Sequence, residues 1–280
     1  MADNGYFKDK VAVITGGGGT LCSCIARHLA EEGARVAVIG RTMGKLEAVV
    51  DGITAAGGVC IAVTGDVSDE ESMRRAAEEI RARLGSCDIL VNGAGGNNPK
   101  GTTTSEYFDK ADLLDENARS FFDLDKDGVS FVFNLNFLGT LLTTQAFAVD
   151  MLETGGCIVN ISSMNAYTPL TKIPAYSGAK AAVSNFTQWL AVHFANCGIR
   201  VNAIAPGFFA TNQNRTLLFN EDGSLTPRSH KIISQTPMGR FGEPEELLGT
   251  LRFLIDDKAS GFVTGITIPV DGGFSAYSGV

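Results

Sequence analysis

Short apolar runs recur along the whole chain, and an amphipathic, helix-like segment separates most of them. Strands buried on both faces have continuous apolar sequences, and regular strand–helix alternation is typical of a parallel sheet covered by helices. The clearest helical segments are 68–85 and 244–257. We therefore predict one α/β domain over residues 1–280, with a doubly wound parallel sheet of about seven strands and helices on both faces. The predicted strands are 10–16, 34–40, 59–66, 87–95, 156–163, 199–207 and 266–273.

The charge and hydropathy pattern excludes several classes of protein. The net charge is −8 and no long basic run occurs, so the electrostatic footprint of a nucleic-acid-binding protein or a basic membrane-surface helix is missing. No apolar run reaches the ~18 residues that a membrane span needs. The opening sequence, MADNGYFKDK, is polar and lacks the apolar core of a signal peptide. We expect no nucleic-acid partner and no membrane partner.

Cysteine usage indicates a compartment and argues against a metal site. Six cysteines and three histidines occur, without a Cys-x-x-Cys pair or zinc-ligand spacing, so we expect no metal. Cys60, Cys87 and Cys157 lie in or beside apolar strand-like runs, where a free thiol behaves as a small apolar side chain. Free thiols are typical of reducing compartments, and we expect a cytoplasmic protein.

Two polar segments, 96–130 and 208–240, are long for connections that follow a strand. Loops of this length inside a compact domain are usually lids or binding loops. Both leave the carboxyl ends of predicted strands, where open α/β sheets bind ligands. We therefore predict that these segments are substrate loops.

A glycine-rich turn, TGGGGTLC, lies between the first predicted strand and an amphipathic helix. Such a turn lets backbone N–H groups approach a pyrophosphate, so it predicts a dinucleotide site. The residues expected to form this part of the site are Thr15, Gly16, Gly17, Gly18, Gly19, Thr20 and Leu21.

The end of the second predicted strand bears on the choice between NAD(H) and NADP(H). NAD enzymes commonly place an acid there for the ribose 2′-hydroxyl, whereas this chain has Gly40 and Arg41. An arginine suits a 2′-phosphate, which favours NADP(H); a solvated Arg41 and NAD(H) are the alternative. Asp66 and Val67 end the third predicted strand, where they could meet the adenine.

Tyr176 and Lys180 stand four residues apart in PAYSGAK, with only small residues between them. On a helix this spacing puts both on one face, roughly 6 Å apart. A nearby ammonium would lower the pKa of the phenol from about 10 toward neutrality, which gives an acid usable at cellular pH. Taken alone, the pair is better interpreted as a surface tyrosine beside a solvated lysine, because such pairs are common on helix faces.

Six segments in order, spread over essentially the whole chain, resemble the short-chain dehydrogenase/reductase family. The resemblance implies a Rossmann-type sheet with strand order 3-2-1-4-5-6-7 and an NAD(P)-dependent oxidoreductase. The chain departs from the family at Thr20 and Cys22, where glycine is usual. We expect the Cys22 sulfur to push its helix outward slightly, which puts the tightness of cofactor binding in question. The matching segments are Thr15 to Gly19, Asn92-Gly93-Ala94-Gly95, Asn136, Ser163, the Tyr176 and Lys180 pair, and Pro206, Gly207 and Thr211.

The resemblance also implies roles for the catalytic residues. Tyr176 exchanges a proton with the substrate carbonyl, and Lys180 lowers the tyrosine pKa and can bind the nicotinamide ribose. Ser163 hydrogen-bonds the carbonyl oxygen, and Asn136 holds a water that relays the proton. The other cofactor-binding residues that it implies are Asn92, Gly93, Ala94, Gly95, Pro206, Gly207 and Thr211.

Within the family, stretches such as NGAGGNNPKGTT, ISSMNAYTPLTKIPAYS and VDGGFSAYSGV are similar to the D-mannonate oxidoreductase (D-fructuronate reductase) branch. That similarity implies a sugar-acid ketone as substrate, D-fructuronate or its alcohol D-mannonate. The alternatives are a gluconate 5-dehydrogenase-like or other polyol or keto-acid reductase, and a non-catalytic dinucleotide-binding sensor. The sensor is disfavoured because it would need none of the four catalytic residues.

A sugar acid needs a cation for its carboxylate and polar groups for its hydroxyls. We rank Arg215 first and Lys100 second for the carboxylate, because guanidinium and ammonium groups pair well with it, and Lys172 third. The candidate substrate residues are Asn97, Asn98, Lys100, Asn165, Lys172 and Arg215.

The family resemblance further implies a homotetramer. The segment 186–195, FTQWLAVHFA, is apolar around most of a helical circumference, which indicates burial on more than one side. A helix buried entirely within one chain is the alternative.

Overall fold

The fold was described from a computed structural model, which covers residues 6–211 and 214–279. Its centre is a seven-stranded parallel sheet in the order β3-β2-β1-β4-β5-β6-β7, so the predicted fold class is confirmed. Each strand lies within one of the predicted apolar runs. The strands are β1 (Val11–Thr15), β2 (Arg35–Gly40), β3 (Val59–Thr64), β4 (Ile89–Asn92), β5 (Gly156–Ile161), β6 (Ile199–Pro206) and β7 (Thr267–Val270).

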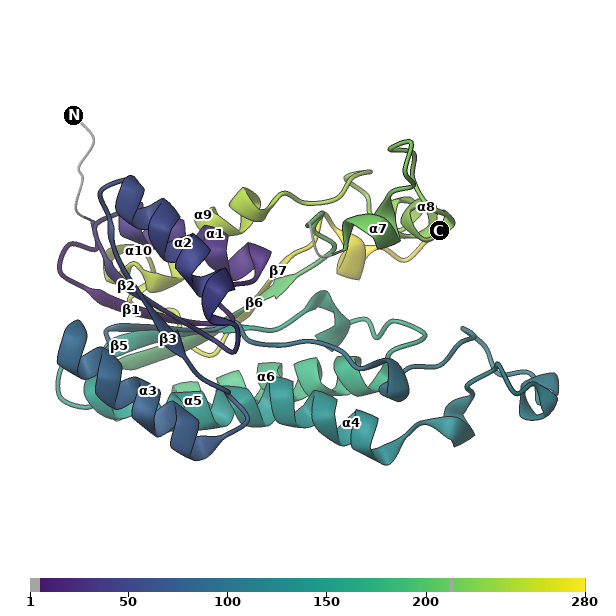
Figure 1. Cartoon of the computed structure of the whole chain (residues 1–280), viewed down its shortest axis with the longest axis horizontal. Coiled ribbons are helices and arrows are strands. Elements are labelled where there is room, and N and C mark those ends of the chain that lie inside the picture. The colour runs from purple at the N-terminus through teal and green to yellow at the C-terminus, as the bar shows by residue number, and fades with distance from the viewer. Residues whose placement is uncertain (1–5, 212–213, 280) are drawn as a thin grey trace.

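The two faces of the sheet are buried by two groups of helices (Figure 1). Side chains alternate along a strand, so Ile14 faces one layer and Val13 the other. The first layer contains α1 (Thr20–Glu31), α2 (Met43–Ala55) and α9 (Leu248–Ile255). The second contains α3 (Glu70–Arg83), α5 (Gly139–Ala148) and α6 (Pro174–His193).

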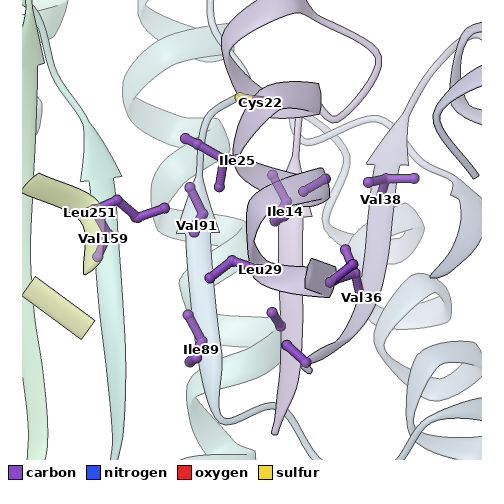
Figure 2. Close-up of a cluster of buried hydrophobic side chains, with 14 of the residues drawn as sticks. Ile14, Cys22, Ile25, Leu29, Val36, Val38, Ile89, Val91, Val159 and Leu251 are labelled. Carbon is purple, nitrogen blue, oxygen red and sulfur yellow. The ribbon is translucent and has the colours of Figure 1, made fainter. Parts of the chain in front are cut away.

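The core beneath α1 shows why this helix stays against the sheet. Ile25 and Leu29, one helical turn apart, point from α1 onto Ile14 and the neighbouring strands (Figure 2). Both side chains are almost completely buried, which stabilises each by roughly 1.5–3 kcal/mol relative to exposure. This contact holds the first turn of α1, and the glycine-rich sequence before it, at the carboxyl edge of the sheet.

A long helical stretch crosses the second layer. It begins with α4 (Lys126–Phe133), passes through a π-helical turn at Asn134–Leu138 and continues as α5. In the part of the chain that the structure describes, Lys126–Met151 is the one helix long and apolar enough to cross a membrane. Length and composition do not separate a membrane span from a core helix, and this stretch packs against α3 and α6 of the same chain.

The predicted loops both contain ordered turns. Segment 96–130 forms three short 3₁₀ turns before α4 starts, and part of it projects away from the sheet (Figure 1). Segment 208–240 contains two helices, α7 (Arg215–Leu218) and α8 (Pro227–Ser234). Leu218, Ile232 and Phe241 form a small apolar core under these helices, so this segment is a folded flap rather than a plain loop. A last short helix, α10 (Asp257–Ser260), follows α9.

Candidate active site

A cleft beside the glycine-rich turn lies at the carboxyl edge, where the strand order reverses between β1 and β4. Its volume is about 490 Å³, and open α/β sheets bind ligands at such a reversal. It extends from the glycine-rich turn and Arg41 to Ser163 and Tyr176. The predicted cofactor residues that line it are Gly16, Gly18, Gly19, Thr20, Leu21, Arg41, Gly93, Ala94, Gly95, Tyr176, Lys180, Pro206, Gly207 and Thr211.

Five predicted cofactor residues do not line this cleft. The buried Thr15 hydroxyl accepts hydrogen bonds from the N–H groups of Gly93 (3.1 Å) and Ala94 (3.2 Å), and so joins two segments of the cleft. Asn92 donates to Asn160 (2.9 Å) inside the sheet. The others pack or cap: Gly17 lies against Val38, Val67 lies against Gly139, and Asp66 accepts from the Ser68 N–H. Sequence position alone did not distinguish the supporting residues from the lining ones.

Tyr176, Ser163 and Lys180 come together at one end of the cleft. Ser163 follows β5, while Tyr176 and Lys180 share the first turns of α6, which starts at Pro174. Proline is well suited to the first turn of a helix because its missing N–H would have no partner there. The Lys180 ammonium is almost completely buried and donates to the Ile161 carbonyl at 2.7 Å. Burial lowers the pKa of Lys180 to about 8.

The expected effect of Lys180 on the Tyr176 pKa is not seen. Burial raises the pKa of Tyr176 above its ordinary value, and hydrogen bonding with Ser163 offsets part of that rise. Lys180 lies 5.7 Å from the centre of the tyrosine ring, but its nearest polar partner is the Ile161 carbonyl. Helical spacing fixed the neighbourhood of the two residues correctly, whereas burial, which the sequence does not specify, sets the direction of the shift. A phenol that keeps its proton at neutral pH suits proton donation to a carbonyl.

Asn136 occupies the π-helical turn between α4 and α5, and π turns are frequent at functional sites. Its side-chain amide donates to the Gly96 carbonyl at 2.7 Å and accepts from the Gly96 N–H at 3.2 Å. A Cβ on Gly95 would lie 2.7 Å from Asn136 Oδ1 and 3.1 Å from Lys180 Nζ. Asn136 therefore holds the segment after β4 close to the buried lysine.

The two departures from the family at Thr20 and Cys22 both line the cleft. Cys22 lies on α1 near the end of the strand that carries Val91 (Figure 2). Its sulfur takes the space that a side chain on Gly93 would need. The room for the sulfur thus comes from Gly93, which has no side chain. Burial raises the Cys22 pKa to about 12.

The candidate substrate residues are scattered. Asn97 donates to Thr102 (3.3 Å), the Asn98 side chain accepts from the Lys100 N–H (2.9 Å), and the Lys100 side chain is exposed. Arg215 is also exposed, with its guanidinium 5.5 Å from the Phe219 ring centre. As the structure describes them, neither the cleft nor the cavities near it are lined by Lys100 or Arg215. The structure therefore lends no support to their ranking for the carboxylate.

Asn165 and Lys172 are placed closer to the chemistry. The Asn165 N–H donates to Ser163 Oγ at 3.3 Å, and its buried Oδ1 has no partner among the described residues. Lys172 lines a second cavity of about 520 Å³, which adjoins the cleft because Phe208 lines both. Glu106, Arg228 and Lys231 line the same cavity and were missed. The run PRSHK, with two cations three residues apart in a predicted lid, was the available signal.

Comparison with known proteins decides the family. A family model described as short chain dehydrogenase matches residues 10–222. The chain belongs to this family. As a short-chain dehydrogenase it is an oxidoreductase, and the expected membership and enzyme class are confirmed.

Across 6–211 and 214–279, no group of three or more His, Cys, Asp or Glu side chains could hold a metal ion.

Three relatives of this short-chain dehydrogenase are informative. A solved structure from Haemophilus influenza, provisionally named a D-mannonate oxidoreductase and containing NAD, is 56% identical over 99% of both chains, with a TM-score of 0.94. The uncharacterized oxidoreductase UxuB of Bacillus subtilis is 57% identical over 97% of this chain and 96% of its own. A gluconate 5-dehydrogenase from Burkholderia cenocepacia, solved with NADP and tartrate, is 29% identical over 99% of both chains, with a TM-score of 0.82.

Proposed function

We propose that this short-chain dehydrogenase transfers a hydride between a nicotinamide cofactor and a sugar-acid ketone, with D-fructuronate and D-mannonate as the pair. One observation carries the proposal. Ser163, Tyr176 and Lys180 gather at one end of a cleft shaped for a dinucleotide, beside a cavity that carries cations. The similarity to a protein named for D-mannonate supports the choice of substrate.

The cleft fits the cofactor on its own geometry. Backbone N–H groups at the start of α1 point to the place where a pyrophosphate would lie, and the helix dipole favours an anion there. The buried Lys180, with its polar atom at the catalytic end, would hold the ribose next to the nicotinamide. The bound nicotinamide would supply or accept the hydride, and the protein supplies the proton and the orientation.

In the direction of reduction, Tyr176 gives its proton to the carbonyl oxygen as that oxygen gains negative charge. The raised pKa of Tyr176 keeps the phenol protonated at neutral pH. Ser163 donates to the same oxygen and stabilises the developing charge, a contribution of roughly 3–4 kcal/mol in comparable sites. Lys180, 5.7 Å from the centre of the Tyr176 ring, and Asn136, behind Gly95, keep this end of the site in place.

For the cofactor we propose NADP(H), with NAD(H) as the alternative. Arg41, Thr42 and Lys45 line the adenosine end of the cleft, and no carboxylate lines it among the described residues. Two cations without an acid match a 2′-phosphate better than a free 2′-hydroxyl. The relatives differ on this point, since one was solved with NAD and another with NADP.

The second candidate substrate is a gluconate-type keto acid. It is supported by the similarity of the whole fold to the gluconate 5-dehydrogenase. The decisive experiment is a panel of keto sugar acids with the purified enzyme, each assayed with NADH and NADPH by absorbance of the reduced cofactor. We expect the highest kcat/KM with D-fructuronate. A higher value with a 5-keto gluconate would favour the second candidate, and no turnover with any keto acid would contradict the proposal.

A further inference from the structure

The cavity beside the catalytic end has an unusual charge for this chain. Lys172, Arg228 and Lys231 line it together with a single carboxylate, Glu106, which leaves two net positive charges on a protein of net charge −8. Apolar side chains make up most of the remaining wall, among them Ile173, Phe208 and Phe274. Arg228 and Lys231 are exposed, so these charges stay in contact with water.

The four charged groups are not equivalent. Lys231, on α8, pairs with Glu106 at 2.8 Å, which joins the flap to the projecting segment. Lys231 and, to a smaller extent, Lys172 lower the pKa of Glu106, so both ammonium groups lie near that carboxylate. For Lys172 and Arg228 no ion pair is found within the described residues. These two cations are therefore available to an incoming anion.

The cavity lies next to the turn of α6 that holds Tyr176, the proposed proton donor. Ile173 precedes the first turn of α6, and Tyr176 lies in that turn, so the wall of the cavity leads directly to the proton donor. Phe208, two residues after β6, lines both the cavity and the cleft, so the two adjoin there. In linear D-fructuronate the ketone is next to one end of the carbon chain and the carboxylate is the other end. A substrate with its ketone at Tyr176 can extend its carboxylate into this cavity.

We propose that Lys172 and Arg228 bind the substrate carboxylate, and that Glu106 positions Lys231 beside them as the third cation of the subsite. Arg228 provides the two parallel N–H donors that match a carboxylate, and Lys172 provides a point charge. The subsite sets the preference for an acid over a neutral ketose. This inference rests on the proposed function, because it assigns the acid end of that same substrate.

The test compares D-fructuronate with D-fructose, its neutral counterpart, for the parent enzyme and for Arg228→Gln and Lys172→Gln. Each variant should raise KM for the acid at least ~10-fold while kcat/KM for the neutral ketose and the Kd of the cofactor stay within about twofold. Arg228→Lys should recover part of the acid preference, which a purely structural role would not predict. Lys110→Gln, which removes a cation from the projecting segment outside the cavity, is the matched control.

The outcomes separate the two levels of the proposal. If the parent enzyme reduces D-fructuronate and both Gln variants keep its acid-over-neutral ratio, the carboxylate is bound elsewhere and this inference is wrong. If the parent enzyme reduces no keto sugar acid at all, the proposed function fails and the subsite fails with it.

Discussion

The Cys22 sulfur occupies the space into which a side chain on Gly93 would project. Gly93 leaves room at this point, and the Cys22 sulfur fills it. Cys22 is buried on α1, and Gly93 follows β4 at the wall of the cleft. The expected outward shift of α1 was inferred from the size of the Cys22 sulfur alone. Gly93, which has no side chain, gives that sulfur room.

This relationship predicts that Gly93→Ala lowers the free energy of unfolding by about 1–3 kcal/mol, because the added methyl group overpacks the site. Cys22→Ala in the same chain should recover part of that loss, with a coupling of at least ~0.5 kcal/mol. Recovery should be incomplete, since the new Cβ would also lie 2.9 Å from the Thr15 carbonyl. Urea unfolding of the two single variants and the double variant measures the coupling. Strictly additive losses would show that the two positions do not compete for space.

The buried Lys180 predicts a pH-dependent stability. The pKa of Lys180 is about 8 in the folded protein and 10.5 ordinarily, so the unfolded chain binds more protons between these two pH values. The free energy of unfolding therefore rises with pH in this range, because the cost of burying the charged ammonium disappears. Lys180→Met should therefore unfold at higher urea than the parent at pH 7, and this advantage should shrink by pH 10. Activity should fall at least ~10²-fold in the same variant. An advantage that does not change between the two pH values would contradict a depressed lysine pKa.

Arg41 predicts the cofactor preference. Arg41→Ala should lower kcat/KM for NADPH at least ~10-fold, because one charge-assisted hydrogen bond is worth about 1.5–3 kcal/mol, and leave NADH almost unchanged. Arg75→Ala, an exposed arginine on α3 away from the cleft, is the control. A parent enzyme that prefers NADH tenfold or more would overturn the preference whatever the variant does.

The outer face of α6 predicts self-association. Leu190 and Ala191 are buried in the chain, but Trp189 is 55% exposed and Val192 is 80% exposed, so the helix is not buried entirely within one chain. We predict a homotetramer, with light scattering giving a mass about four times the chain mass of 29.5 kDa. Val192→Asp should dissociate it, because a charge at an apolar interface lacks a partner. A parent protein that scatters as a stable monomer would rule this assembly out.

The sequence predicted the sheet well because buried parallel strands have continuous apolar runs that glycine-rich turns end sharply. It also placed Tyr176, Ser163 and Lys180 correctly, since short motifs at fixed spacing determine local geometry. It did not show that Lys100 and Arg215 lie outside the cavity, because residue type in a long segment does not determine which side chains line it. Arg228 and Lys231 reach the cavity only because segment 208–240 folds into two helices over its own apolar core.

The central claim is that Tyr176 gives its proton to a sugar-acid ketone at the end of this cleft. The most direct measurement is the D-fructuronate-dependent oxidation of reduced cofactor by the parent enzyme and by Tyr176→Phe, with the Kd of the cofactor measured on both. The Phe variant keeps the ring and loses the acid, so we expect turnover at least ~10²-fold slower with an almost unchanged Kd. A Phe variant that binds cofactor normally and keeps most of the parent turnover would contradict the account.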